Sequence, residues 1–498
     1  MINSDLALRL IAAIAIQAVA ISVHAQNEED ALRLSSFGGG GTARSNGLAN
    51  AIGSVGADPM SVMINPAGMA LYRASALSFT SVLEINKVDA RYYGTTTPYS
   101  QERFAVNNLA LVLHTPAKEG SEWMSATWGV TYDRQTSQHW TTDVVGTRVP
   151  STILEHFVRE ADGTPYANIV DVFPFTAGPV WDAYGIDTIP DSTSTYQGFI
   201  PFGSDTRQRH TIESHGATTR TTFFYSGNYK DRLYVGASVG VVGQRFRRVT
   251  NHTEYSLDAL LDLQGLTYKE DLTTNGNGFD VNVGVIGRVT DRIRVGAAFQ
   301  SPQWLLLNDA YFTEFSTTFR TPDNLGNFSY ASTSPDGTFS YRLRTPWRGT
   351  ISATYLAGKN GLFSVDYDYA DFRTMRYRTA NNTEDLYDFS TENDLIKKRF
   401  RSRSGLRIGT EWRMGNWYFR GGWGYAQDPF SKNDAAKGQA LRNYCGGLGY
   451  RGEHLTVDLA FTAGIQGTRF FQYDPELVNA TETDRKSYST FLTIGLRP

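Results

Sequence analysis

The connections between successive strand patterns alternate in length along this chain of 498 residues. Tight polar turns are expected at Lys230-Asp231, Thr290-Asp291, Lys359-Asn360, Gly415-Asn416 and Gly452-Glu453. Long polar stretches separate them, at approximately 135–217, 248–277, 302–337, 376–398, 428–439 and 464–485. Membrane-spanning up-and-down β-barrels are built this way, because their turns are short at one end and their loops long at the other. The pattern therefore predicts an all-β, antiparallel transmembrane barrel.

The strands themselves show a period of two. From Leu233 to Val241 apolar residues alternate with Tyr234, Gly236, Ser238 and Gly240, which gives one greasy face and one small or polar face. About fourteen such segments occur, near 74–85, 103–115, 122–134, 218–229, 231–247, 278–290, 291–301, 338–357, 360–375, 399–414, 415–427, 440–451, 452–463 and 486–497. An even count closes a barrel with both ends on one side. A soluble β-sandwich or propeller is the alternative, but more uniform loops are typical of those folds.

Composition excludes several classes of function. A mean hydropathy of −0.34 is compatible with a barrel, whose strands face lipid only at every second residue. The formal net charge of −3 offers no basic surface for nucleic acid. A single cysteine, Cys445, excludes a disulfide framework within the chain and a multi-cysteine zinc site. The eight histidines show no metal-binding spacing, so we expect neither metal nor cofactor.

The N-terminus has the features of a secretory signal peptide. Arg9 precedes an apolar run from Leu10 to Val23, and the run ends in Val23-His24-Ala25, which supplies the small residues that a signal peptidase needs before a cleavage site at Gln26. The run is shorter than the roughly 20 residues that a membrane anchor needs. We therefore expect residues 1–25 to be removed.

Residues 26–73 are too irregular for a strand, and residues 74–498 form the expected barrel. The segment is rich in glycine and ends in Asn65-Pro66-Ala67-Gly68. Irregular backbone at membrane depth is tolerated only inside protein, so a plug in the lumen is expected. A disordered periplasmic tail is the alternative, but the apolar side chains of the segment favour packing. They are Ile52, Val55, Met60, Val62, Met63, Ile64, Met69 and Leu71.

Several blocks resemble the FadL/TodX family of outer-membrane transporters for hydrophobic compounds, in its Bacteroidetes-type version. The blocks in the plug segment are Leu34-Ser35-Ser36-Phe37-Gly38, Gly41-Thr42-Ala43-Arg44, Ala57-Asp58 and Asn65-Pro66-Ala67, the last of which matches the family's hatch signature. Later blocks lie at 344–348, 364–372, 407–413 and 420–425. The resemblance implies a fourteen-stranded barrel with a hatch in its lumen. We expect the hatch and gating residues to be Gly38, Asp58, Asn65, Pro66, Ala67 and Gly68.

The same resemblance implies a function without an energy source and without catalysis. It predicts passive uptake of hydrophobic small molecules, such as long-chain fatty acids or aromatic hydrocarbons, across the Gram-negative outer membrane. Substrate would leave by a lateral opening when the hatch rearranges. Outer-membrane lipid and the barrel assembly machinery are the other expected partners. The C-terminal Leu496-Arg497-Pro498 departs from the aromatic residue that ends many such barrels.

Other residues leave alternatives open. Phe173, Phe175, Trp181 and Phe199 lie in the stretch 135–217, the largest expected loop, where they either capture ligand or pack a folded loop. Charged residues expected to face the lumen should brace the wall: Arg294, Asp366, Asp368, Arg407, Glu411, Arg413, Arg420 and Asp458. Two other functions use the same barrel. A porin for hydrophilic solutes would lack a hatch, and a lipid hydrolase would need Ser238 of Gly236-Ala237-Ser238-Val239-Gly240 at a strand-to-helix turn.

Overall fold

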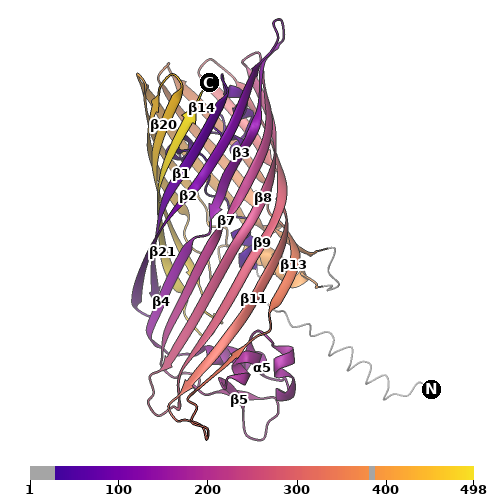
Figure 1. Ribbon diagram of the computed structural model, residues 1–498, viewed down its shortest axis with the longest axis vertical. Coiled ribbons are helices and arrows are strands. Elements are labelled where there is room, and N and C mark those ends of the chain that lie inside the picture. The colour runs from indigo at the N-terminus through magenta and orange to yellow at the C-terminus, as the bar shows by residue number, and fades with distance from the viewer. Residues whose placement is uncertain (1–27, 381–386, 498) are drawn as a thin grey trace, which may run out of the picture.

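The structure is a closed β-barrel that encloses residues 28–72 (Figure 1). This computed structural model describes residues 28–380 and 387–497, and the expected signal peptide lies outside them. One 19-stranded sheet makes the wall. Each continuous run of strand from one end of the barrel to the other is called a stave below. Four staves consist of two collinear strands each. The short β12 pairs only within a hairpin, so the wall has fourteen antiparallel staves. The fold class and strand count expected from the sequence are confirmed.

The staves follow one another around the barrel in chain order, and β1 closes against β21. They are β1 Ala76–Tyr92, β2 Thr95–Pro116, β3 Trp123–Ser137 with β4 Trp140–Val149, β7 Thr206–Tyr229, β8 Leu233–Ser256, β9 Leu263–Arg288, β10 Ile293–Gln300 with β11 Trp304–Phe319, β13 Gly337–Arg344 with β14 Arg348–Ala357, β15 Gly361–Asp371 with β16 Arg376–Thr379, β17 Ser402–Met414, β18 Trp417–Ala426, β19 Leu441–Arg451, β20 Leu455–Phe470 and β21 Thr481–Leu496. The additional strand β12 spans Ser329–Thr333.

The period of two separates a lipid face from a luminal face. Val239 and Val241 on β8 are about half exposed on the outside, whereas Ser238 between Ala237 and Val239 is buried inside. Aromatic pairs gather near the short turns, such as Trp123 with Tyr229 at 5.4 Å between ring centroids. Apolar side chains that point outward with an aromatic belt are the signature of a barrel in lipid. Among the described residues, no helix is long and apolar enough to cross a bilayer.

The staves are longer than the sequence patterns indicate at the end opposite the C-terminus. The expected loop 135–217 contains β4 and the first part of β7, and strand also fills most of 248–277 and 302–337. Both faces of these extensions carry polar residues, so the alternation of polarity disappears although the strand continues. The first connection at this end is also short: Tyr93 and Gly94, both with positive φ, form a two-residue hairpin.

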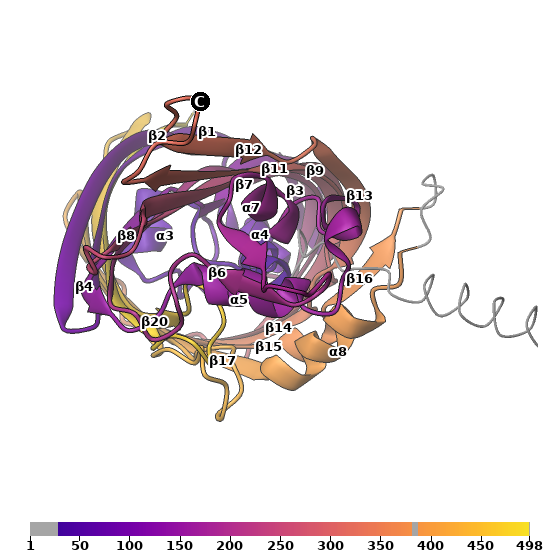
Figure 2. The same ribbon diagram turned by 90° about the horizontal axis from the view of Figure 1, so that it is seen from below.

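A small folded unit covers the barrel at this end (Figures 1 and 2). This cap consists of α5 Ile153–Ala161, η2 Tyr166–Asn168, α6 Ile169–Val172, α7 Ala177–Asp182 and the hairpin β5 Ile186–Thr188 with β6 Tyr196–Gly198. Its core includes Leu154, Phe157 and Val180, which pack with Leu266 and Phe315 from the strand ends.

One seam of the wall is closed by a helix rather than by a strand. β16 pairs with β13, and its other edge has no partner in β17, which pairs with β15 only as far as Asp371. Helix α8 (Ser390–Arg399) lies along this edge. Asn393 caps it: Tyr377 N–H donates to Asn393 Oδ1 at 2.8 Å, and Asn393 Nδ2 donates to Tyr377 O at 3.1 Å. An edge covered in this way cannot pair with another chain.

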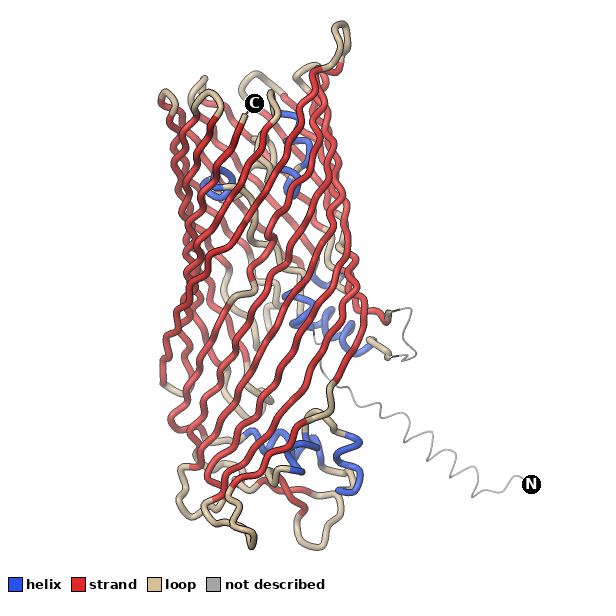
Figure 3. The backbone as a smooth tube through the Cα atoms, viewed as in Figure 1, coloured by secondary structure: helices blue, strands red, loops and turns tan. Residues whose placement is uncertain are grey.

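Residues 28–72, named the luminal segment below, lie inside the barrel (Figure 3). They form α2 Glu28–Leu34, α3 Ala43–Gly47, α4 Ser61–Ile64 and the 3₁₀ turn η1 Pro66–Leu71. Ala43 N–H donates to Thr493 Oγ1 of β21 at 2.7 Å, and Thr493 also contacts Thr80 Oγ1 of β1 at 2.8 Å. The segment is thus bound at the point where the barrel closes.

Candidate gating segment and luminal cavity

The Asn65-Pro66 turn rests on a glycine surface of the wall. Gly236, Gly284 and Gly296 come from the adjacent strands β8, β9 and β10. A Cβ on Gly284 would lie 2.0 Å from Asn65 Oδ1, and one on Gly236 would lie 2.5 Å from the Pro66 carbonyl carbon. Only residues without a Cβ let the two backbones approach so closely.

The same turn is held by a complete set of hydrogen bonds. Asn65 Nδ2 donates to Gly53 O at 2.8 Å and to Val285 O of the wall at 3.2 Å. Asn65 Oδ1 accepts from Ala67 N–H at 3.2 Å, which caps η1, and Ser226 Oγ of β7 donates to Pro66 O at 2.7 Å. Asn65 therefore connects two parts of the luminal segment to the wall.

The other candidate gating residues have different surroundings. Asp58 is buried and accepts from Thr42 Oγ1 at 2.7 Å and from Met60 N–H at 3.0 Å, so it fixes the fold of the luminal segment. Gly68 accepts from Ala57 N–H at 2.9 Å. Gly38 makes no such contact and lies beside a cavity.

An ion network connects the luminal segment to four strands on the opposite side, β17 to β20. Arg44 Nε lies 2.9 Å from Glu411 Oε2 of β17, and Arg420 Nε of β18 lies 2.6 Å from the same oxygen. Arg420 Nη1 continues to Asp458 Oδ1 at 2.8 Å, and Arg451 Nη1 reaches Asp458 Oδ2 at 2.7 Å. Each buried charge in this network faces a charge of opposite sign, as burial requires.

A second luminal group binds the backbone of the segment. Asp366 Oδ2 accepts from Gly53 N–H at 2.9 Å and lies 3.8 Å from Arg407 Nη2, and Arg294 Nη1 donates to Val55 O at 3.3 Å. Bracing by luminal charges is thus observed for these residues. Arg413 was expected to join them, and that expectation is wrong: it is exposed, and its Nε donates to Gly415 O at 2.9 Å. The residue lies next to the short turn, beyond the depth that the luminal segment fills.

A cavity of about 90 Å³ lies between the luminal segment and the wall. One part of its lining is apolar and includes Phe37, Met60, Met63 and Ile64. The other part is charged, with Arg348, Arg403, Arg407 and Asp368. The lining also contains Gly38, Gly39 and Gln135, so the cavity extends to β3.

The wall is split beside this cavity. β2 pairs with β3 only between Asn108 and Pro116, and residues 95–107 pair with β1 alone. On the outer face of this unpaired part, Phe104 and Val106 are exposed, so the split lies in the lipid-facing band. A missing ladder of hydrogen bonds makes this a weak position of the cylinder.

The luminal segment is attached to both edges of the split. Asn107 Nδ2 of β2 donates to Gly41 O at 2.7 Å. Gly41 N–H donates to Asp133 Oδ1 of β3 at 3.1 Å, and Gly39 N–H donates to Gln135 O at 2.8 Å. Neither Asn107 nor Asp133 stands out in the sequence as a functional residue, because their role depends on a break in strand pairing.

Ser238, the serine of the Gly-x-Ser-x-Gly match, lies within the regular strand β8. Its hydroxyl donates to Val62 O of the luminal segment at 3.2 Å. Within residues 28–380 and 387–497, no group of three or more His, Cys, Asp or Glu side chains could hold a metal ion.

The aromatic candidates of the cap are packed rather than free. Phe173 is buried in the cap core and Trp181 packs against it. Phe175 lies 4.6 Å from Tyr311, and Phe199 lies 5.6 Å from Phe319, between ring centroids. Their role in capturing ligand remains a prediction.

Comparison with known proteins places this geometry in a known fold. No protein-family model matches the sequence, and no curated protein does. A solved FadL homologue from Pseudomonas aeruginosa aligns with a TM-score of 0.56 at 13% identity, over 93% of this chain and 99% of that chain. The Pseudomonas putida toluene transporter TodX aligns with a TM-score of 0.51 at 12% identity, over 92% and 98%. The chain therefore has the fold of the FadL/TodX channels, and the resemblance inferred from the sequence is confirmed at that level.

Proposed function

We propose that this chain is an outer-membrane channel through which small hydrophobic molecules enter the cell by passive diffusion. The observation that supports this most directly is the attachment of the luminal segment to both edges of a wall split that faces lipid. A hydrophobic solute that reaches the split can dissolve in the bilayer, whereas a hydrophilic solute cannot. The solved relative TodX is described as a toluene transporter, which agrees with this assignment.

The proposed route has three parts. Solute passes the cap and reaches the cavity, where Phe37, Met60 and Met63 offer an apolar surface. A shift of the luminal segment breaks the hydrogen bonds of Gly41 to Asn107 and Asp133. The solute then leaves sideways between β2 and β3. No chemical step is needed, and we propose no catalytic role for Ser238 or any other residue.

The gating residues of this proposal are the ones named from the sequence, Gly38, Asp58 and Asn65 to Gly68, together with Asn107 and Asp133. The proposal also includes removal of residues 1–25, a hatch formed by residues 26–73, and insertion by the barrel assembly machinery. In the proposed orientation in the outer membrane, the short turns face the periplasm and the cap faces the outside of the cell.

A disulfide between the luminal segment and the wall tests the mechanism. Ser54 Oγ and Thr354 Oγ1 of β14 are 2.7 Å apart, so Ser54→Cys with Thr354→Cys, in a Cys445→Ala background, can form this bond. If the segment must move, uptake of a labelled fatty acid or toluene by cells should fall about tenfold when oxidised and return with reductant. The same bond between Thr468→Cys and Thr483→Cys, whose hydroxyls are 2.6 Å apart on β20 and β21, is the control.

Three outcomes would contradict the proposal. Full uptake with the Ser54–Thr354 bond in place would show that the luminal segment need not move. A large steady conductance of the intact protein in planar bilayers would instead indicate a porin for hydrophilic solutes. Lipid hydrolysis that disappears in Ser238→Ala would indicate the hydrolase.

A further inference from the structure

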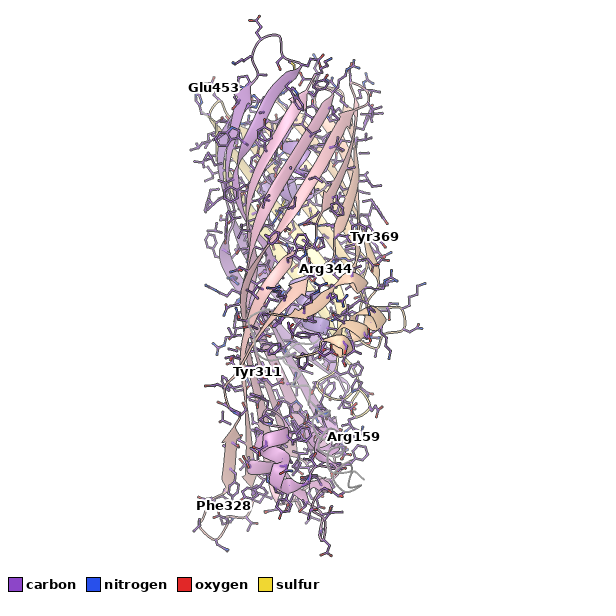
Figure 4. All side chains as sticks on the ribbon, turned by 90° about the vertical axis from the view of Figure 1, so that its right-hand side faces the viewer. Arg159, Tyr311, Phe328, Arg344, Tyr369 and Glu453 are labelled. Carbon is purple, nitrogen blue, oxygen red and sulfur yellow. The ribbon has the colours of Figure 1, made fainter. Side chains whose placement is uncertain are left out.

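Four arginines lie opposite one another on the outer face of the wall. In the register of β13 with β16, Arg342 pairs with Arg378 and Arg344 pairs with Arg376. All four side chains are exposed, and Figure 4 shows Arg344 at the surface on the cap side of Tyr369. They are named the arginine cluster below.

The cluster has no counter-charge among residues 28–380 and 387–497. None of the four arginines forms an ion pair there, and Arg344 Nη2 donates only to a carbonyl, Thr374 O at 3.3 Å. The carboxylate of Asp371, at the end of β15, is bound by Arg373 at 2.7 Å. Like charges directly opposite on neighbouring strands are destabilising, and among the described residues no ion pair offsets the repulsion between these arginines.

The depth of the cluster in the membrane follows from its aromatic neighbours. Trp304 on β11 is the register partner of Arg344. Trp347 lies 5.9 Å from Phe299 and 5.7 Å from Tyr369, between ring centroids, and forms a belt with them. Toward the short turns the outward residues are apolar, including Ile351, Val365 and Tyr367. An aromatic belt marks the boundary of the hydrocarbon core, so the cluster lies in the headgroup layer on the cap side.

We propose that the arginine cluster binds the phosphate groups of a phosphorylated glycolipid of the outer leaflet. Guanidinium groups bind phosphate through two parallel hydrogen bonds, and four of them in two rows can hold two phosphates. The acyl chains of such a lipid would run toward the short turns, along the exposed surfaces of Phe299 and Ile351. The inference takes from the proposed function only that the cap faces outward, and it does not depend on what the channel transports.

Native mass spectrometry of the purified protein in detergent, titrated with lipid A, tests the assignment. The variant Arg344→Gln with Arg376→Gln should bind at least about tenfold more weakly. The matched control, Arg207→Gln with Arg245→Gln, removes two other exposed arginines that lack ion pairs among the described residues, and it should bind as the unchanged protein does. Heat-modifiable gel mobility verifies that each barrel is folded.

Three results would overturn the proposal. Equal loss in the control pair would mean that only net charge matters. Equal binding of dephosphorylated lipid A would assign the contact to the acyl chains. Saturation of the cluster by inorganic phosphate at similar concentration would assign it to a free anion rather than a lipid. The variant Arg344→Lys with Arg376→Lys separates the two parallel hydrogen bonds of a guanidinium group from its charge. Lysine keeps the charge but cannot form both bonds to one phosphate, so this variant should bind more weakly than the unchanged protein and more tightly than the glutamine variant.

Discussion

At the scale of single residues, three glycines of the wall explain how the luminal segment can pack closely against it. Gly236, Gly284 and Gly296 are far apart or unremarkable in the sequence, and they become one surface only through strand register. The Asn-Pro-Ala turn could be predicted as a hatch element from its motif. The glycine surface on which this turn rests could not be predicted. Each of the three glycines, taken alone, also fits the general pattern of small residues on the luminal face of a strand.

A methyl group on this surface should displace the turn. Gly284→Ala places a Cβ 2.0 Å from Asn65 Oδ1, so Asn65 must move and lose its contact with Val285. We expect a measurable rise in bilayer conductance while the barrel remains folded. Gly287→Ala on the same strand is the control, because a Cβ there has no neighbour within 4 Å. Equal conductance in both variants would contradict the tight fit.

Removal of one charge from the ion network should weaken the whole fold. Glu411→Ala leaves Arg44 and the buried Arg420 without their carboxylate. Loss of one partner of a buried ion pair costs about 3–5 kcal/mol, so the free energy of unfolding in urea should fall by that amount. Arg413→Ala, at an exposed position nearby, should change it by less than about 0.5 kcal/mol. Similar values for both variants would show that the network contributes no stability.

At the scale of elements, strand number was easier to predict than strand length. The pattern in Phe279, Val281, Val283 and Val285 marks where β9 meets lipid. The same strand begins at Leu263, where both faces carry polar neighbours or cap contacts, and the sequence there has no period. Hydrophobic alternation therefore indicates which part of a strand crosses the hydrocarbon core of the bilayer, and it does not indicate where the strand ends.

Deletion of residues 26–66 tests the luminal segment as an element. The staves are hydrogen-bonded to one another, so the barrel should still fold and give the heat-modifiable band of a closed barrel. Without the segment, conductance in planar bilayers should rise severalfold. Unchanged conductance would mean that another part of the chain, such as the cap, closes the pore.

At the scale of the whole molecule, the sequence predicts the barrel and the luminal segment, but not the split in the wall or the cavity. Fourteen segments of alternating polarity predict the barrel, and the glycine-rich, irregular residues before them predict the luminal segment. The split between β2 and β3 depends on where pairing ends, at Asn108 with Asp133, and no local pattern marks a bond that is not made. The cavity likewise collects residues from 37 to 443, which only the closed barrel brings together.

Closure of the barrel has a consequence for the order of assembly. Ala43 N–H is bound by Thr493 of β21, the strand that closes the barrel against β1. The hydrogen-bonding site for the luminal segment is therefore incomplete until β21 lies in place. Enclosure of the segment and closure of the barrel are thereby coupled steps of assembly.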